Sequence, residues 1–353
     1  MYSIERLPTQ QQLETPAVWK KTIAAHRALA EFKGICHSIP NQSILISTLA
    51  LQEAKDSSEV ENIITTHDEL FGATVSPETM TVAAKEVQHY SNALITGFEL
   101  VKKNGILTCN HIIEIQEVLE NNRAGFRRQL GTVLKNERTG EVVYTPPQNY
   151  EEIVALMGQL EQFINNSNDN LDPLIKLAII HHQFESIHPF YDGNGRTGRI
   201  INVLFLVLNQ LLDIPVLYLS RYIVRHKDEY YQLLQEVRNT DNWEKWILYI
   251  LDAVEQTSIN TTKTIDLIKK SMLNYKHIIR VEFPHMYSQD LINHLFKYPY
   301  TKIEFTAKEL NKTRQTATKY LEELTERKLL RKIKKGKTNY YINIELFDIL
   351  VNV

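Results

Sequence analysis

The twelve residues from His188 to Arg199, HPFYDGNGRTGR, constrain the fold of this chain more than any other stretch. Because proline after His188 disfavours helical backbone at the histidine, a preceding helix must end there and the imidazole must project from a turn. Gly193 and Gly195 follow at the start of a second helix. That helix is apolar almost all round, which places it in the centre of a core. Its apolar residues are Ile200, Ile201, Val203, Leu204, Phe205, Val207 and Leu208.

The same stretch indicates a phosphorylated ligand. A helix that begins with glycines offers unpaired N–H groups and a positive dipole to an anion, and its backbone can approach phosphates without a Cβ in the way. Arg196 and Arg199, three residues apart, share one face of this helix and can clamp outer phosphates bidentately. Asn194 can donate an amide hydrogen bond. A nucleotide fits this pattern.

His188 and Asp192 suit two further tasks. A histidine in a turn is a suitable general base. Asp192 lies just ahead of the glycines, where it can hold Mg²⁺, an ion that prefers carboxylate, water and phosphate oxygens. A simpler interpretation is a Gly-Asn-Gly turn that begins a helix with two solvated arginines. The whole combination is far more specific than a lone glycine pattern, so we favour the nucleotide site.

The stretch resembles, at every defined position, the signature of the Fic (filamentation induced by cAMP) family, HPFx(D/E)GNGRxxR. The resemblance implies transfer of a nucleotide monophosphate, usually AMP from ATP, to a tyrosine, serine or threonine hydroxyl of a target protein. By position it implies His188 as the base, Asp192 as the Mg²⁺ ligand, Gly193 to Gly195 as an anion hole, and Arg196 and Arg199 as phosphate ligands. An enzyme of the same fold that removes AMP from a target protein, or one that both adds and removes it, stays open as an alternative.

Composition indicates an intracellular soluble protein. With 353 residues, 43% hydrophobic and 23% charged, the chain can bury a sizeable core and divide into about two or three domains. The N-terminus, MYSIERLPTQQQLETP, lacks the apolar region of a signal peptide, and no run reaches the roughly 18 apolar residues of a membrane span. We therefore expect a cytoplasmic protein. Cys36 and Cys109 are too few for a disulfide framework or a metal site.

Helical periodicity dominates the chain and predicts a mainly α fold. Asp172 and Pro173 have the residue types of an N-cap and a first helical position. The predicted helices include residues 78–103, 110–120, 150–165, 172–186, 195–212, 227–238 and 243–271. Trp243 and Trp246 fit the apolar face of the last of these, so we expect both in the core.

One predicted hairpin, residues 132–145, interrupts the helices. Apolar runs at Val133-Leu134 and from Val142 to Tyr144 flank a polar turn that contains a glycine. In the Fic resemblance this hairpin, preceded by Gly125-Phe126-Arg127-Arg128, matches the flap that holds the target protein by strand pairing. The alternative is a surface hairpin without a function.

The run from Lys227 to Tyr231 resembles the helix on the adenine side of Fic enzymes, where a tyrosine supports the base. An aromatic ring can stack on adenine, which makes Tyr231 a candidate nucleotide contact. Paired tyrosines on an amphipathic helix also serve as half-buried packing, and both interpretations stay open.

Residues 57–62 support two interpretations. Taken alone, Ser58 with Glu61 three residues on is a capping box, which begins a helix. The stretch also resembles the autoinhibitory motif of many Fic proteins, (S/T)xxxE(G/N), met here by Ser57, Glu61 and Asn62 in an inhibitory helix near 57–63. A Glu61 carboxylate paired with Arg199 would withhold the arginine that should hold the γ-phosphate, and would repel that phosphate. ATP would then bind unproductively.

The C-terminal part is basic. Residues 306–340 contain eleven Lys and Arg against four Glu, a net charge of +7, which leaves −9 for the rest of the chain. A short helix from Thr306, a second helix over 313–327 and a hairpin of 329–334 and 339–343 resemble a winged helix. That resemblance implies DNA binding, with the second helix in a major groove. A module for protein contacts or for homodimer formation is the alternative. The exposed groove residues would be Arg314, Gln315, Thr318 and Lys319.

These patterns together predict a Fic-type helical core with a β-hairpin flap, plus a small C-terminal winged-helix domain. The predicted regions are 1–105 with the inhibitory helix, 106–255 with the catalytic core, a helical linker 256–289 and the winged helix 290–353. A nucleotide-sensing DNA-binding regulator is an alternative function. A metal hydrolase built on His182, Glu185 and His188 is disfavoured, because no further ligand set is evident and the helix break spoils their common face.

Overall fold

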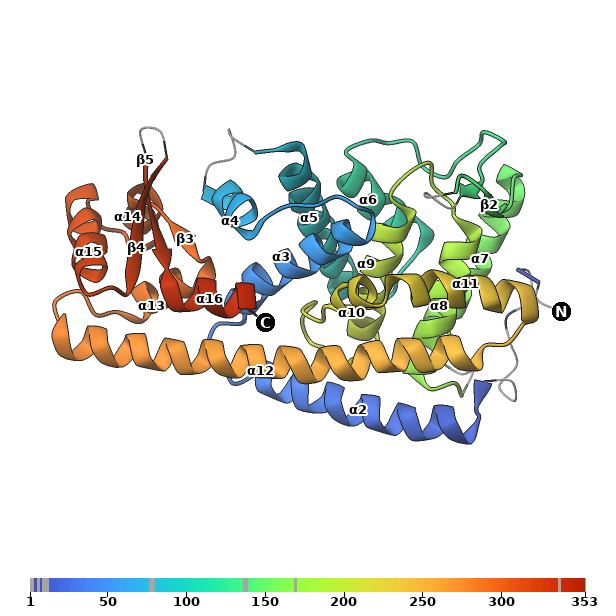
Figure 1. Cartoon of the computed structure of the whole chain (residues 1–353), viewed down its shortest axis with the longest axis horizontal. Helices are drawn as coiled ribbons and strands as arrows, with labels where there is room; N and C mark the ends of the chain where they lie inside the picture. Colours follow the sequence, from blue (N-terminus) through green and yellow to red (C-terminus); the bar gives the residue numbers. More distant parts are fainter. Residues whose placement is uncertain are drawn as a thin grey trace.

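The computed structural model describes residues 3–4, 7, 13–75, 80–135, 139–167, 170–335 and 338–352. Figure 1 shows an elongated molecule, with a larger helical body at one end and a small domain of helices and strands at the other. The long helix α12, Glu244–Glu282, runs beneath both parts in this view. Within the described ranges, no helix is long and apolar enough to cross a membrane. The predicted mainly α fold is confirmed.

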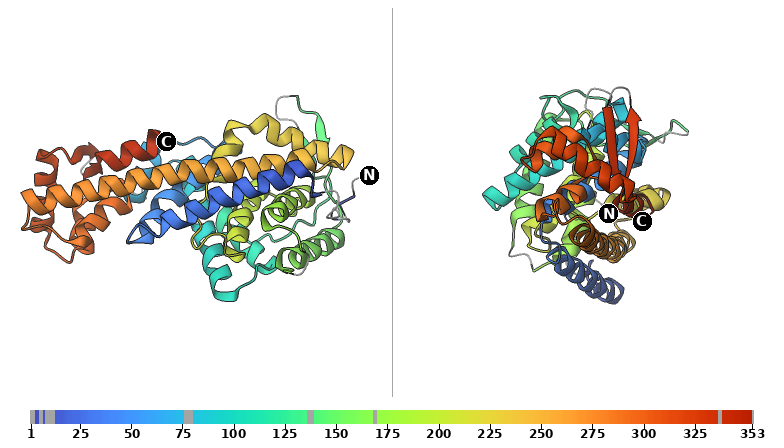
Figure 2. Two further views of the ribbon diagram at one scale, coloured as in Figure 1. Left: turned by 90° about the horizontal axis from the view of Figure 1, so that it is seen from below. Right: turned by 90° about the vertical axis from the view of Figure 1, so that its left-hand side faces the viewer.

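Helix α12, Glu244–Glu282, is 39 residues long, and α2, Pro16–Cys36, lies alongside it (Figure 2). Lys21 of α2 forms ion pairs with Asp252 and Glu255 of α12. The predicted boundary at 255/256 falls inside α12, so most of the predicted linker is the second half of a continuous helix. Helix α12 continues past its predicted end at 271, because buried residues at helical spacing pack its second half. These residues are Met272, Tyr275 and Ile279.

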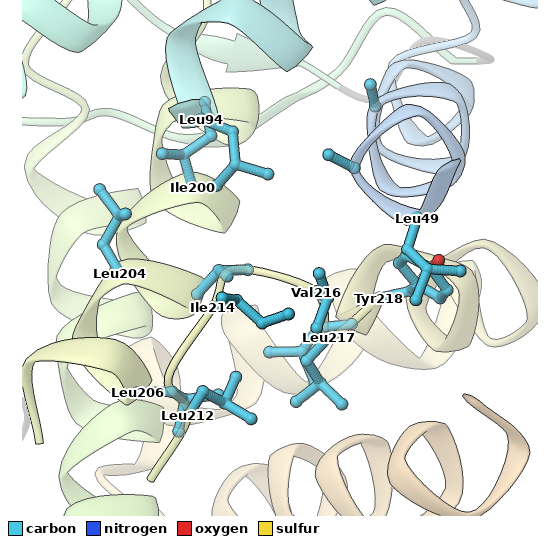
Figure 3. Packing of buried hydrophobic residues seen from close by; sticks show 14 of the residues in the cluster. Leu49, Leu94, Ile200, Leu204, Leu206, Leu212, Ile214, Val216, Leu217 and Tyr218 are labelled. Atoms are coloured by element: carbon cyan, nitrogen blue, oxygen red, sulfur yellow. The ribbon is translucent and has the colours of Figure 1, made fainter. Parts of the chain in front are cut away.

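Helices α8, Pro173–Ile187, and α9, Asn194–Leu208, form the centre of the body. Asp172 caps α8 and Pro173 is its first residue, as predicted. Every α8 residue from Leu174 to Ile187 is buried, as are most residues of α9. Figure 3 shows Ile200 and Leu204 of α9 beside Leu94 of α5, Val82–Asn104. The turn between α8 and α9 is therefore fixed by two core helices.

The remaining body helices surround this centre. The predicted helices agree with the structure to within a few residues, apart from the long end of α12 and the end of α9 at Leu208 instead of 212. Residues 78–79 of the first predicted helix lie outside the described residues. Trp243 and Trp246 are buried, as expected. The other elements are α3 Gln42–Val60, α4 His67–Val75, α6 Cys109–Glu120, α7 Tyr150–Asn165, α10 Leu219–Arg225 and α11 Lys227–Thr240.

Ser57 and Ser58 lie in the last turn of α3, which is capped at its N-terminus by Asn41. Glu61 is the first residue beyond the helix. A capping box needs its serine at the start of a helix, so the capping-box interpretation of Ser58 and Glu61 is wrong. The helix predicted near 57–63 is the C-terminal end of α3, and it stops at Val60.

The predicted hairpin is present. Strands β1, Leu134–Lys135, and β2, Val142–Tyr144, pair antiparallel, with Leu134 opposite Tyr144. Part of the predicted turn, residues 136–138, lies outside the described residues. Val142 and Val143 are exposed, so the hairpin presents apolar side chains to the surface.

The C-terminal domain combines three helices with a three-stranded antiparallel sheet in the order β3-β5-β4, followed by α16, Ile344–Asn352. This confirms the predicted winged helix, whose wing turn at 336–337 lies outside the described residues. The domain packs on the body, where the Gln52 amide of α3 donates to the Leu350 carbonyl over 3.0 Å. Its other elements are α13 Gln289–Lys297, β3 Tyr300–Thr301, α14 Ile303–Glu309, α15 Arg314–Glu326, β4 Leu330–Lys335 and β5 Thr338–Asn343.

Candidate active site

His188 is the residue at which α8 ends. Its backbone is left-handed, with φ of 49°, and its N–H donates to the Phe184 carbonyl over 2.9 Å. A left-handed backbone is uncommon for a residue other than glycine and occurs often at functional sites. The turn was predicted from Pro189. The imidazole Nδ1 is buried and has no hydrogen-bond partner within the described part of the chain.

The environment of His188 keeps its imidazole neutral. Burial is the largest cause, followed by the positive charges of Arg127 and Arg238, and together they lower its pKa to about 4. At neutral pH the ring therefore has a free nitrogen lone pair. A neutral imidazole is the form that a general base requires.

Gly193, Asn194 and Gly195 form the turn that begins α9, which we call the cradle. Gly193 precedes the helix with φ of 76°, a backbone that glycine adopts without strain. A Cβ at Gly195 would collide with the Glu61 carboxylate. Asn194 was expected to donate to a ligand, but its amide bonds both the N–H and the carbonyl of Phe190, at 2.8 and 2.9 Å. In this structure Asn194 fixes the turn.

Asp192 lies on the surface beside this cradle. Its Oδ1 accepts the Gly193 N–H at 2.7 Å, and its backbone carbonyl accepts the Gln116 amide at 3.2 Å. The side chain is exposed, so a cation can reach it.

Arg199 is buried and is held by the end of α3. Its Nη2 lies 2.7 Å from Oε1 of Glu61 and donates to the Ser57 carbonyl, while its Nε donates to the Ser57 hydroxyl over 2.8 Å. Burial alone would raise the pKa of the Glu61 carboxyl, but Arg199, Arg196 and Lys227 lower that pKa below its ordinary value. The carboxylate is therefore ionised at neutral pH, and both Nε and Nη2 of Arg199 are engaged by the end of α3.

A network of contacts fixes α3 in this place. The buried Glu53 carboxyl accepts hydrogen bonds from the Tyr90 and Ser220 hydroxyls. Asp56 pairs with Nε of Arg221 at 3.0 Å. Beyond the helix end, Asn62 adopts a positive φ of 60° and accepts a hydrogen bond from Lys227. These contacts aim Glu61 at Arg199.

Arg196 was expected to face phosphates, yet its guanidinium is held by two carboxylates. Its Nη1 lies 2.6 Å from Glu86 of α5, and its Nη2 lies 2.8 Å from Glu120 of α6. Sequence reasoning missed both glutamates, because they occupy ordinary positions of predicted helices and belong to no motif. In this structure Arg196 ties α9 to α5 and α6.

Arg127 is a third residue whose role was missed in the sequence. Its side chain is completely buried and donates to three backbone carbonyls, those of His188, Ile187 and Pro147. Its own N–H donates to the Pro189 carbonyl over 2.8 Å. Arg127 thus joins the turn at His188 to the chain that leaves the flap. The only sequence signal was its place just ahead of the predicted flap.

We expect Arg127→Ala to lower the thermal midpoint by several degrees. The change leaves three buried carbonyls without their donor, and a hydrogen bond from a charged donor contributes about 1.5–3 kcal/mol. Differential scanning fluorimetry of the whole chain measures the shift. Arg123→Ala, on the exposed segment before Arg127, is the matched control and should melt like the wild type. Equal midpoints for the two variants would contradict this role.

The flap and Tyr231 lie around the same turn. Tyr144, at the end of β2, donates to the Ser186 carbonyl over 3.1 Å, and the Arg238 guanidinium lies 3.9 Å from the centre of its ring. Tyr231 is 46% exposed, whereas its neighbour Tyr230 is buried and bonds His181. Tyr231 therefore has a face that a ligand can reach, and its contact with adenine stays a prediction.

The disfavoured metal hydrolase gains no support. Within the described ranges, no three His, Cys, Asp or Glu side chains are arranged to hold a metal ion. His182 bonds the Leu234 carbonyl and packs edge-on against Trp243, which explains it as a core residue.

Comparison with known families places three domains along the chain. Residues 19–99 match the Fic/DOC family N-terminal domain, and residues 106–206 match the Fic/DOC family domain itself. Residues 272–346 match the C-terminal domain of SoFic-like protein adenylyltransferases. The second match contains the whole motif from His188 to Arg199, and the first contains Glu61.

Individual relatives agree with these matches. A protein adenylyltransferase Fic of Aedes aegypti is 28% identical over 211 residues, which is 57% of this chain and 37% of that protein. A probable protein adenylyltransferase of Aquifex aeolicus is 32% identical over 186 residues, 50% of this chain and 53% of the relative. The matches thus span about a third to a half of these relatives' lengths.

Solved structures share the fold. A Fic family protein from Desulfovibrio desulfuricans G20 superposes with a TM-score of 0.58 at 18% identity, over 93% of this chain and 96% of that one. Fic-1 from C. elegans gives 0.53 at 20% identity, over 70% and 71%. With its motif, its fold and its three domain matches, this chain belongs to the Fic/DOC family.

Proposed function

We propose that this protein is a protein adenylyltransferase, which transfers AMP from ATP to a hydroxyl side chain of a target protein. The observation that carries the proposal is the turn from His188 to Arg199, where a neutral imidazole adjoins a helix N-terminus opened by Gly193. The names of its relatives support the same reaction.

In the proposed reaction, the target hydroxyl oxygen attacks the α-phosphorus of ATP and pyrophosphate leaves. His188 accepts the hydroxyl proton, because its imidazole is neutral at the working pH. The first N–H groups of α9 stabilise charge on the phosphates. Arg199 holds the γ-phosphate once it is released from Glu61.

Mg²⁺ fits this site through Asp192. The carboxylate is exposed beside the cradle, and oxygen donors are the ligands that this ion prefers in proteins. When bound, Mg²⁺ would neutralise phosphate charge. Asp192 would hold it together with phosphate oxygens of ATP, since Mg²⁺ is commonly bound by one or two carboxylates and the substrate.

Glu61 makes the resting protein autoinhibited in this proposal. An ATP γ-phosphate cannot reach Arg199 while the Glu61 carboxylate lies 2.7 Å from its Nη2. The target protein would dock at the flap, where β1 and β2 are short and Val142 and Val143 are exposed. An extended segment can add to such a strand edge by backbone hydrogen bonds.

Each region of the chain has its own role in the proposed function. Residues 106–255 supply the catalytic core and the flap, residues 1–105 supply the inhibitory segment, and residues 290–353 form a separate binding module. In this division α12 joins the core to the module as one rigid helix.

ATP labelled at the α-phosphate tests the reaction class. The purified chain and its Glu61→Gly variant are incubated with a lysate and Mg²⁺, and label on protein is followed. Label from the α-phosphate should reach protein, while label from the γ-phosphate should leave as pyrophosphate. Transfer from the γ-position alone would make the protein a kinase and overturn the proposal.

Removal of AMP is the second candidate activity. The observation that favours it is the ionised Glu61 carboxylate beside the cradle, which can orient a water molecule toward a phosphorus. A target labelled by the Glu61→Gly variant is purified and returned to the wild-type chain. Release of labelled AMP by the wild type, but not by Glu61→Gly, would support this direction.

DNA binding is a candidate for the C-terminal module, because Arg314 and Lys319 are exposed on the N-terminal half of α15. We expect the whole chain to retard duplex DNA at low salt, and the affinity to fall steeply as salt rises. Arg314→Ala with Lys319→Ala should weaken binding, since each removes a phosphate or base contact. Mobility shift at several salt concentrations measures this. No shift at low salt would leave protein contact or homodimer formation as the task of the module.

A further inference from the structure

A cavity of about 390 Å³ lies between α10 and α12. None of its lining residues belongs to the motif from His188 to Arg199, to the flap, or to the contact between Glu61 and Arg199. Its volume is in the range of sites that hold small organic molecules. The proposed mechanism of AMP transfer does not use this cavity.

The α12 wall of the cavity is polar, although a buried helix face is ordinarily apolar. Thr257, Thr261 and Thr264 are buried on this face at helical spacing. The Thr261 hydroxyl donates to the Thr257 carbonyl, and the Thr264 hydroxyl to the Asn260 carbonyl. Threonine forms helices less readily than leucine. Threonines at these positions therefore lower both the helix propensity and the apolar packing of the segment, and they line the cavity with hydroxyl groups beside the Asn260 amide.

The opposite wall is positively charged. Arg221 and Arg225 lie one turn apart on α10 and both line the cavity. Arg225 has no ion pair within the described residues, while Nε of Arg221 binds Asp56 of α3. The one acidic lining residue is Asp252, and Lys21 of α2 neutralises it. Arginine pairs bind phosphate well, because the planar guanidinium matches its oxygens bidentately.

Tyr218 lines the cavity just before α10, and its side chain is visible beside Leu49 in Figure 3. It is 3% exposed, and its hydroxyl is buried without a hydrogen-bond partner in the described part of the chain. A buried hydroxyl without a partner costs about 1–3 kcal/mol, so such groups commonly mark the place of a missing polar molecule.

We propose that this cavity binds a small phosphorylated molecule that carries hydroxyl groups, such as a sugar phosphate. Arg225 and Arg221 hold the phosphate. The Asn260 amide, which can both donate and accept, holds a ligand hydroxyl, and Asp252 accepts another.

A ligand in the cavity can affect the contact between Glu61 and Arg199 through Arg221. Arg221 binds Asp56, which precedes Ser57, and Ser57 holds Arg199 by two hydrogen bonds. A phosphate that draws Arg221 away from Asp56 loosens the end of α3 and with it the contact between Glu61 and Arg199. The ligand is then an activator, and this consequence rests on the proposed function.

Calorimetric titration of the whole chain tests the binding site, with glucose 6-phosphate, ribose 5-phosphate and glycerol 3-phosphate as probes. Arg225→Ala and Asn260→Leu should each weaken the tightest of them about tenfold or more, the usual effect of losing a charge-assisted or buried hydrogen bond. Arg280→Ala, an exposed arginine near the end of α12, should bind like the wild type. Arg199→Ala separates binding at the motif from binding at the cavity.

Two results would overturn the site. One is the absence of binding by all three probes at millimolar concentration. The other is binding that Arg199→Ala removes and Arg225→Ala leaves unchanged, because the phosphate then occupies the motif.

The coupling to Glu61 is measured separately, as self-modification at saturating ATP. The bound probe should raise the rate in the wild type and leave it unchanged in Arg225→Ala. Binding without activation, in a preparation whose Glu61→Gly variant is active, overturns the coupling. An inactive Glu61→Gly variant would instead count against the proposed transfer, while the calorimetric result for the cavity would still hold.

Discussion

His188→Ala should lower transfer of AMP by about 10²–10⁴-fold, the usual loss when a general base is removed. Its affinity for ATP should stay near that of the wild type, because the imidazole acts on the proton of the acceptor hydroxyl and does not hold the phosphates. Rates are measured with ATP labelled at the α-phosphate in the Glu61→Gly background, and ATP binding by calorimetry. His277→Ala, an exposed histidine on α12, is the matched control and should keep full activity.

The pH profile gives a second measure of the same residue. The pKa of His188 is lowered to about 4 in the folded chain, so the imidazole stays deprotonated as pH falls from 7 and gains its proton only near 4. The acid limb of kcat/KM, which reports groups of the free enzyme, should therefore lie well below the usual histidine value of about 6.5. Full activity of His188→Ala would refute the base assignment.

The turn at His188 was predictable because its determinants are local. Proline at 189 ends α8, glycine at 193 accepts the positive φ that opens α9, and the apolar run behind Arg199 buries the helix. The family resemblance added the Glu61 motif, which periodicity alone could not assign. The features of the turn itself depend on neighbours within one or two helical turns.

The partners of the two motif arginines were less predictable. Glu86 and Glu120 reach Arg196 from sequence positions 110 and 76 residues away, and nothing in a helical pattern marks a glutamate that faces inward. Arg127 is similar, since its three carbonyl partners lie at the end of α8 and in the segment just before α7, and their approach depends on how these two helices pack. Such contacts are set by tertiary structure, and a local sequence pattern carries no information on them.

The serines at 57 and 58 illustrate a different limit. A serine followed three residues later by glutamate reads as a helix start, yet α3 ends there. Burial decides the case: both serines are completely buried, and the Ser57 hydroxyl and carbonyl bind Arg199. A short polar pattern thus fits either end of a helix until its long-range partner is known.

Glu61→Gly should raise transfer or self-modification about 10- to 100-fold at saturating ATP. The contact between Glu61 and Arg199 is a charge-assisted hydrogen bond of about 1.5–3 kcal/mol, and a factor of ten in a rate corresponds to about 1.4 kcal/mol. Removing the carboxylate frees Arg199 for the γ-phosphate and removes a charge that repels it. Label from the α-phosphate, followed over time on protein, measures the rate.

Glu59→Gly is the matched control for the change in backbone. Glu59 is half-buried in the last turn of α3 and pairs with Lys55, so its loss disturbs the helix end by about 1 kcal/mol without releasing Arg199. This variant should keep the low resting rate. Arg199→Ala should be inactive both alone and combined with Glu61→Gly, because the released arginine itself orients the triphosphate. An unchanged rate in Glu61→Gly would leave the contact as a structural ion pair and refute autoinhibition by Glu61.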